Sequence, residues 1–139
     1  MSVEINVRYD GGLKCTAEHV PSRAAFETEA PVDNGGKGTK FSPTDLVGAA
    51  FGTCVMTIMG LIAGHSGIDL KGTTVRVVKE MASHPARRIG GLTATITFPK
   101  GLEISDADRM KFERTIETCP VRQSLHPDVK VEAKFVYPS

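Results

Sequence analysis

Three cysteines, Cys15, Cys54 and Cys119, are the side chains of this sequence best suited to chemistry. A thiolate can attack an electrophile, be oxidised or bind a metal. Cys54 lies in the middle of the most apolar stretch, where the surroundings disfavour the charged thiolate and are typical of an inert, buried cysteine. Cys15 alternates with Leu13 and Ala17 as on a strand, so we interpret it as a packed or partly exposed bystander.

Cys119 has a different setting, because it follows an expected helix and directly precedes Pro120. At this position it can cap a short helix that starts at Pro120, with Arg122 one turn further on. The positive end of a helix favours the thiolate form of a cysteine. If Cys54 and Cys119 meet in the fold, they can act as an attacking and a resolving thiol. Their spacing leaves open whether they meet.

Other site chemistries have little support in the sequence. There is no CxxC or HxxxH pair, and the four histidines are scattered: His19, His65, His84 and His126. We therefore expect no metal site. A GxSxG nucleophile elbow is absent, and the segment "DNGGKG" lacks the spacing of a phosphate-binding loop. We expect no cofactor.

The first part of the chain predicts three strands followed by a long helix. Alternating apolar and polar residues indicate strands near residues 3–9 and 13–17, and we expect a third short strand around residues 25–30. The polar, glycine-rich residues 31–41 are typical of a mobile loop beside a site. Ser42 then starts the helix as its N-cap, with Pro43 at the first position and Asp45 completing a capping box. We expect this helix to reach Ala63, with a bend between Gly48 and Gly52 that splits it in two.

The second part predicts two strands, a helix and a last strand. The strands cover residues 73–81 and 87–99, and Ser105 with Asp108 forms a second capping box at the start of the helix. Alternation returns over residues 129–135. The order is βββ-α(α)-ββ-α-β, so we expect a single α+β domain over residues 1–139 with mainly antiparallel pairing.

The apolar segment from Leu46 to Ala63 contains no charged residue. Its length would allow it to cross a membrane. Its high content of Gly, Ala and Thr, and the amphipathic strands that follow, favour instead a helix buried in a core or a subunit interface. One small domain cannot easily surround such a helix. We therefore expect a homodimer with this helix near the interface.

Charge argues against several classes of partner. The chain has 17 Lys and Arg and 16 Asp and Glu, interleaved along the sequence, so neither nucleic acid nor an anionic membrane is expected as a partner. The polar, alternating N-terminus is unlike a signal or transit peptide, and three widely spaced cysteines fit reduced thiols. We expect a cytoplasmic protein.

Two segments together resemble the OsmC/Ohr family of organic hydroperoxide-related proteins: "SPTDLVGAAFGTC" and "CPVRQSLHPDVKVEAKFVY". The resemblance extends over nearly the whole chain and is greater to an OsmC-related branch than to Ohr itself. It implies an intertwined homodimer built around two central helices flanked by antiparallel sheets, with active sites at the subunit interface.

The resemblance also implies a reaction. Cys54 would be the peroxidatic thiol and Cys119 the resolving thiol, in the reaction ROOH + 2 thiol → ROH + H₂O + disulfide. The apolar residues around Cys54 would bind the organic part of a small apolar hydroperoxide, and a dithiol reductant would reopen the disulfide.

The sequence departs from the family pattern at Thr44. Peroxidatic members often carry Glu at this position, where it helps to hold an arginine against the thiolate. Five cations are candidates to replace that arginine, although each is more typical of a solvated surface charge: Arg8, Lys14, Arg23, Arg87 and Arg88. Two alternatives to a peroxidase therefore stay open, a noncatalytic OsmC-fold protein that binds a small molecule and a cysteine-based redox sensor.

Overall fold

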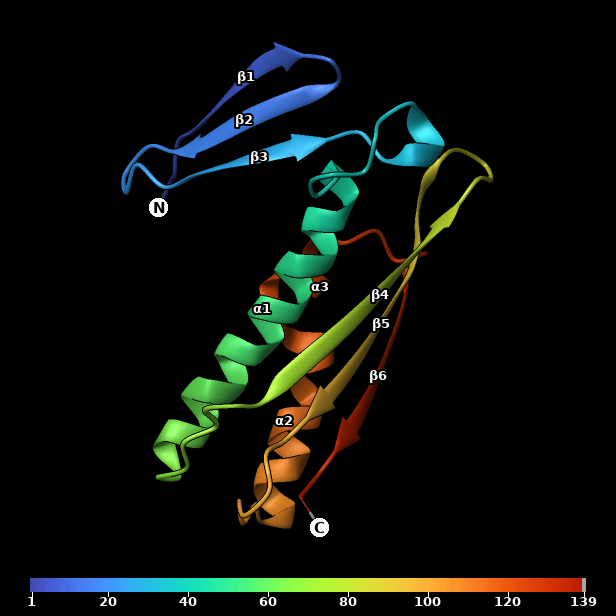
Figure 1. Cartoon of the computed structure of the whole chain (residues 1–139). Coiled ribbons are helices and arrows are strands. Elements are labelled where there is room, and N and C mark those ends of the chain that lie inside the picture. The colour runs from blue at the N-terminus through green and yellow to red at the C-terminus, as the bar shows by residue number, and fades with distance from the viewer. Residues whose placement is uncertain (139) are drawn as a thin grey trace. The chain divides into compact units, whose positions relative to one another are not determined.

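The computed structural model describes residues 1–138 and divides into two compact units, Met1–Val47 and Gly48 to the C-terminus (Figure 1). Each unit contains one three-stranded sheet. Helix α1 (Pro43–His65) begins in the first unit and continues through the second. The α+β class and the order of elements expected from the sequence are confirmed. The expectation of one domain over residues 1–139 stays a prediction.

The N-terminal unit is an antiparallel sheet of β1 (Ile5–Gly11), β2 (Lys14–His19) and β3 (Ala25–Glu29). Pairing of Val7 with Ala17, and of Ala17 with Phe26, places these three residues on one side of the sheet. This side keeps large apolar residues in solvent, since Val7 is 65% and Phe26 50% exposed. The opposite side is polar.

The glycine-rich loop after β3 is fastened to the buried carboxylate of Glu29. This side chain is 2% exposed and accepts hydrogen bonds from the backbone N–H of Lys37 (3.1 Å), the backbone N–H of Thr39 (2.9 Å) and the Thr39 hydroxyl. The bonds from Thr39 hold the pKa of Glu29 below its usual value. Gly36 makes a further close approach, because a Cβ there would lie 1.6 Å from the carbonyl oxygen of Ala30.

The start of α1 has the predicted capping box. Asp45 donates its backbone N–H to Ser42 Oγ (3.1 Å), and Ser42 donates its own to Asp45 Oδ2 (2.9 Å). The predicted bend at Gly48 and Gly52 is wrong, because α1 is one continuous helix. Both glycines face the second sheet, where a Cβ at Gly52 would lie 3.0 Å from Val77 Cγ2. Close packing on the sheet therefore offsets their low helix propensity.

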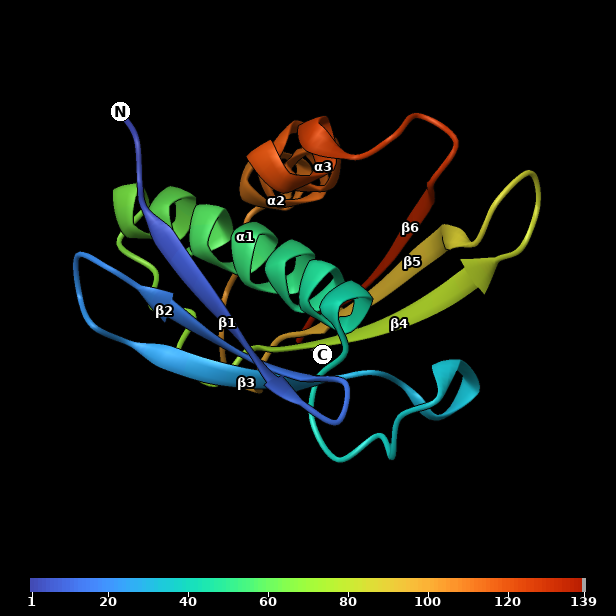
Figure 2. The ribbon, with the colours of Figure 1, turned by 90° about the horizontal axis from the view of Figure 1, so that it is seen from above.

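The C-terminal unit places α1 and α2 (Asp106–Thr118) on one face of a sheet of β4 (Thr74–Ala82), β5 (Arg88–Thr97) and β6 (Lys130–Val136) (Figures 1 and 2). β4 and β5 are antiparallel, whereas β5 and β6 are parallel. Parallel pairing requires a crossover, and α2 with the short α3 (Pro120–Ser124) provides it.

The core of this unit comes from α1, β5 and α2. Phe51, Val55 and Met59 of α1 are fully buried, and Leu92, Ala94 and Ile96 of β5 meet them from the sheet. From α2, Phe112, Ile116 and the adjoining Cys119 join the same core, because their spacing of four and three residues puts them on one face of the helix.

An aromatic cluster fastens the end of the chain to α2. Tyr137 stacks on Phe98 and Phe135, and its hydroxyl donates to Glu113 Oε1 at 2.9 Å. The Arg109 guanidinium lies 4.2 Å from the centre of the Tyr137 ring. Burial, followed by the hydrogen bond to Glu113, raises the pKa of Tyr137 above its usual value.

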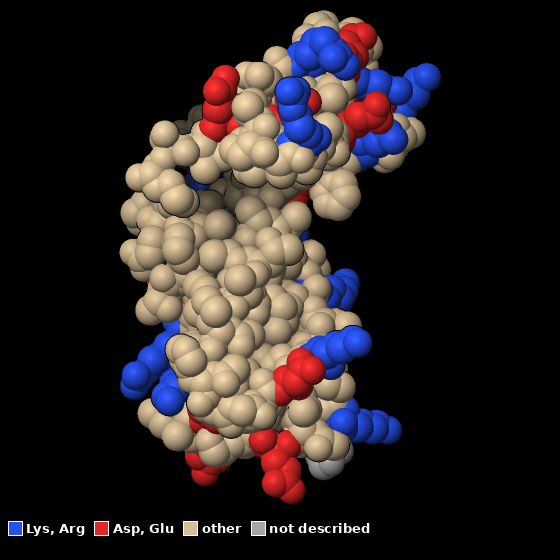
Figure 3. Space-filling view, turned by 90° about the vertical axis from the view of Figure 1, so that its left-hand side faces the viewer, with Lys and Arg blue, Asp and Glu red and all other residues tan. Residues whose placement is uncertain are grey.

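One side of α1 stays in solvent and carries no charged side chain over most of its length (Figure 3). The exposed residues follow helical spacing: Ala50, Thr53, Thr57, Gly60, Leu61 and Gly64. Among the residues 1–138, α1 alone is long and apolar enough to cross a membrane, and 33% of its most apolar 18-residue window is buried.

Candidate active site

The structure brings Cys54 and Cys119 together. Cys54 projects from the middle of α1, and Cys119 stands at the junction of α2 and α3. Both are free thiols, and Cys54 lies close enough to Cys119 to raise the pKa of that thiol. The two cysteines that the sequence only allowed to meet are therefore neighbours within the C-terminal unit.

An apolar pocket of about 410 Å³ opens over Cys54. α1 and the start of α3 supply its walls, which consist of Ala50, Thr53, Cys54, Thr57, Ile58, Pro120 and Val121. Cys119 is not in this lining and is 0% exposed, whereas Cys54 is partly exposed. A molecule in the pocket thus meets Cys54 first, with Cys119 behind it.

The two threonines of the pocket use their hydroxyl protons on their own helix. Thr53 Oγ1 donates to the carbonyl of Ala49 at 2.8 Å, and Thr57 Oγ1 donates to the carbonyl of Thr53 at the same distance. Neither hydroxyl then has a proton to offer an occupant. Cys54 is the only ionisable lining residue. The pocket is suited to an apolar molecule.

Cys119 caps α3, as its position before Pro120 predicted. Its sulfur accepts the backbone N–H of Arg122 at 3.3 Å, and the backbone N–H of Val121 lies nearby. Burial and the neighbouring Cys54 raise the pKa of the Cys119 thiol, and the two N–H groups act in the opposite direction. At neutral pH Cys119 is therefore a thiol placed where a negative charge on sulfur would be hydrogen-bonded.

Of the five candidate cations, Arg87 and Arg88 belong to the C-terminal unit, and neither lines the Cys54 pocket. Arg8 pairs with Asp10, and Arg23 pairs with Glu18. Arg88 donates to backbone carbonyls, including that of Ile89. The guanidinium of Arg122, close in sequence to Cys119, has Nε 3.8 Å from Glu117. Arg122 thus acts on the sulfur through its backbone N–H.

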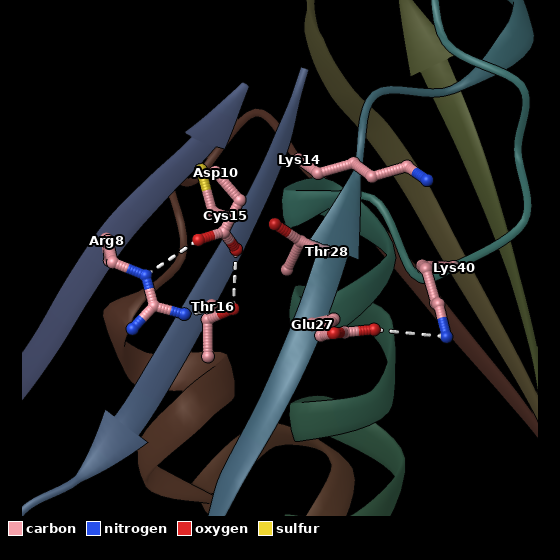
Figure 4. Close-up of a pocket in the computed structure, with 8 residues that line it drawn as sticks. All are labelled: Arg8, Asp10, Lys14, Cys15, Thr16, Glu27, Thr28 and Lys40. Atoms are coloured by element: carbon pink, nitrogen blue, oxygen red, sulfur yellow. Dashed lines mark hydrogen bonds and ion pairs between the residues drawn. The ribbon is translucent and has the colours of Figure 1, made fainter. Parts of the chain in front are cut away.

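Cys15 lies apart from the thiol pair, on β2 of the N-terminal unit. Together with polar residues it lines a hollow of about 210 Å³ (Figure 4). The side chains there are largely satisfied by one another: Asp10 accepts from Arg8 (2.7 Å) and Thr16 (2.6 Å), and Lys40 pairs with Glu27 (3.2 Å). This pattern is typical of a solvated sheet face held by ion pairs.

Metal chemistry has no support in the described residues. Residues 1–138 contain no group of three or more His, Cys, Asp and Glu side chains that could hold a metal ion.

Thr44, where the sequence departs from the family pattern, lies in the first turn of α1 with its hydroxyl 3.4 Å from that of Ser42. It brings no carboxylate to this turn, whose acidic residue is the capping Asp45.

Comparisons with known proteins matched a sequence profile and several solved structures. A sequence profile described as OsmC-like protein matches residues 36–134. A solved structure from Psychrobacter arcticus 273-4, assigned to the osmotic stress and detoxification response, is 41% identical with a TM-score of 0.87, over 94% of this chain and 93% of that one. No curated protein matched the sequence.

Two more distant structures share the fold. An organic hydroperoxide resistance protein OsmC from Legionella pneumophila is 14% identical, with a TM-score of 0.78 over 99% of this chain and 98% of that one. The organic hydroperoxide resistance protein OhrB of Bacillus subtilis is 17% identical, with a TM-score of 0.65 over 97% and 98%. At such identities the likeness concerns the fold alone.

Proposed function

The chain belongs to the OsmC-like family, and from this premise we propose that it is a thiol peroxidase that reduces organic hydroperoxides. The observation that supports the proposal most is the pair of neighbouring thiols, Cys54 and Cys119, of which Cys54 lines an apolar pocket. An enzyme of this class needs one thiol that meets the peroxide and a second thiol within reach of the first.

The proposed chemistry has two steps on the protein. The Cys54 thiolate attacks the outer oxygen of ROOH, the O–O bond breaks, and the alkoxide takes a proton to leave as ROH. Cys54 is then a sulfenic acid. The Cys119 thiolate attacks the Cys54 sulfur, hydroxide leaves as water after protonation, and a disulfide forms. A dithiol reductant returns two electrons and restores both thiols.

The pocket supports an organic hydroperoxide over hydrogen peroxide as the substrate. Ala50, Ile58 and Val121 offer apolar surface to an alkyl or aryl group, which stabilises binding by roughly 25 cal/mol for each Å² removed from water. Hydrogen peroxide has no such group. We therefore expect cumene hydroperoxide to react faster than hydrogen peroxide at equal concentration.

We propose that the protein works as a homodimer, in keeping with the family resemblance. Each unit has one surface of apolar residues that is exposed to solvent. On the N-terminal sheet these are Ile5, Val7, Tyr9 and Phe26, and on α1 they include Leu61, which is 64% exposed. Apolar surface of this extent favours burial against a second copy.

A peroxidase assay with matched cysteine variants tests the function. Wild-type protein, Cys54→Ser and Cys15→Ser are mixed with cumene hydroperoxide and excess dithiothreitol, and peroxide loss is followed. We expect Cys54→Ser to lose about 1,000-fold or more, because the attacking atom is gone. Cys15→Ser should retain the wild-type rate. Wild-type protein no faster than Cys54→Ser contradicts the proposal.

Mass spectrometry distinguishes a peroxidase from a redox sensor and from a noncatalytic binding protein. In Cys119→Ser, hydroperoxide should add oxygen to Cys54, since no thiol can condense with the sulfenic acid. Loss of free thiols without turnover would favour a redox sensor. If Cys54 stays unmodified and the protein still binds an apolar molecule, the result would favour a noncatalytic binding protein. The observation that favours this second candidate is that the lining of the pocket contains no cation.

A further inference from the structure

The two sulfurs of the pair differ in how they can be reached. Cys54 lines the 410 Å³ pocket and is partly exposed, whereas Cys119 is 0% exposed and lies in the core with Phe112 and Ile116. The two thiols are neighbours, so a disulfide bond of about 2.05 Å between them does not bring Cys119 out of the core. The difference in access therefore persists in the disulfide.

Thiol–disulfide exchange has a strict direction of approach. The attacking thiolate must come along the line of the S–S bond, from the side opposite to the sulfur that leaves. Attack on Cys54 comes from the pocket side. Cys119 is 0% exposed and belongs to the buried core that includes Phe112 and Ile116, so a thiolate from solvent has no path to its sulfur. Only one of the two sulfurs is open to a reductant.

The environment of Cys119 also suits a leaving group. A thiolate leaves faster when its negative charge is stabilised. The backbone N–H of Arg122 donates to the Cys119 sulfur at 3.3 Å, and the nearby backbone N–H of Val121 also favours the negative charge there. Charge that appears on this sulfur when the disulfide opens is therefore hydrogen-bonded at once, without movement of a side chain.

We infer that the reductant opens the Cys54–Cys119 bridge at Cys54 and expels Cys119, so that Cys54 takes both the oxidant and the reductant at the same pocket. The inference rests on the proposed function, which supplies the bridge. A reductant thiolate forms a bond to Cys54 Sγ while the Cys54–Cys119 bond breaks, and Cys119 leaves as a thiolate that is then protonated. The second thiolate of a dithiol reductant attacks the mixed disulfide at the reductant's own sulfur and releases Cys54. Two electrons pass from the dithiol to the protein.

The position of a trapped mixed disulfide tests this inference. In a Cys15→Ser background, diamide closes the bridge without hydroperoxide, and 2-mercaptoethanol, which has a single thiol, opens it. The mixture is quenched in acid, free thiols are blocked with N-ethylmaleimide, and the two cysteine peptides are weighed. We expect mercaptoethanol on Cys54 and maleimide on Cys119, in excess over the reverse by about 10-fold or more. Mercaptoethanol mainly on Cys119 overturns the inference.

A second measurement uses each sulfur alone. Cys119→Ser carries mercaptoethanol on Cys54, and Cys54→Ser, modified in urea and refolded, carries it on Cys119. Dithiothreitol should release the Cys54 adduct about 100-fold faster in the native proteins, and at a similar rate in urea, where access is equal. Equal native rates contradict the inference.

Failure of the inference and failure of the proposed function give different results. If diamide closes the bridge and hydroperoxide does not, the peroxidase proposal fails while the adduct on Cys54 still supports the inference. If hydroperoxide closes the bridge and the adduct lies on Cys119, the peroxidase stands and the inference falls. If neither oxidant closes the bridge, both are overturned.

Discussion

The two units of this chain bury their apolar residues to very different extents. Among the described residues, the buried hydrophobic side chains run from Phe51 to Val129 in the C-terminal unit, and Ala17 is the only one in the N-terminal unit. The N-terminal sheet instead leaves Ile5, Val7 and Tyr9 at least 60% exposed. The C-terminal unit thus has a core of its own, and the N-terminal unit gains most from a covering partner.

The difference also explains where the chemistry lies. Cys54 and Cys119 belong to the unit with the packed core, so their contact is held by rigid neighbours. Cys15 lies in a surface hollow among exposed ion pairs such as Lys40 with Glu27, which are worth about 0–1 kcal/mol each. A thiol in that setting has no fixed second thiol beside it.

Matched phenylalanine truncations should give the largest contrast between the units. Phe112→Ala removes a ring with 0% exposure and should cost about 3–5 kcal/mol in the free energy of unfolding. Phe26→Ala removes a ring that is 50% exposed, and its main effect should appear in the dissociation constant of the proposed dimer. Urea unfolding followed by circular dichroism measures the first cost. An equal loss in the free energy of unfolding for Phe112→Ala and Phe26→Ala would contradict the difference in burial between the two units.

Charges placed on either side of the N-terminal sheet test whether one side is covered. Val7→Lys puts an ammonium group among apolar residues, and we expect it to raise the dimer dissociation constant about 100-fold, because a buried charge without a partner is costly. Asn6→Lys, the neighbouring residue on the polar side, should have little effect. Analytical ultracentrifugation measures the dimer dissociation constant of both variants. A wild-type monomer at micromolar concentration, or equal effects of the two variants, argues against this interface.

The Glu29 carboxylate should give a smaller, pH-dependent effect within the N-terminal unit. Its pKa is lowered in the folded protein from a usual value of 4.5, so its stabilising effect is present above that pH and is lost as pH falls through the lower folded value. Glu29→Gln should flatten the acid side of the stability curve. Glu27→Gln, an exposed neighbour, is the control. Thermal melts at several pH values measure both, and parallel curves for wild type and Glu29→Gln would contradict the role assigned to Glu29.

Local features of the fold could be predicted from the sequence because each depends on neighbouring residues. The reciprocal bonds of Ser42 and Asp45 lie within one turn, and the cap that Cys119 makes before Pro120 also lies within one turn. Alternation located the six strands for the same reason. The two segments that contain Cys54 and Cys119 resemble the family in their local sequence, so the resemblance did not depend on how the two cysteines are placed in the fold.

Features that depend on distant residues could not be predicted. The parallel pairing of β5 with β6 follows from the path of α2 and α3 across the sheet, which no local pattern encodes. The continuity of α1 through Gly48 and Gly52 depends on Val77, which lies on another element. The pocket likewise combines α1 with Pro120 and Val121 of α3, so its walls emerge only when the chain is folded.

The aromatic cluster at the end of the chain gives the molecule a built-in optical probe. The sequence has no tryptophan and two tyrosines, and each unit holds one of them, Tyr9 on β1 and Tyr137 beside Glu113. Near-ultraviolet absorbance and emission therefore report on one unit at a time once the other tyrosine is changed to phenylalanine. In an alkaline titration of Tyr9→Phe, the raised pKa of Tyr137 should delay phenolate absorbance until the cluster opens. The two halves can thus be watched separately without attaching a dye.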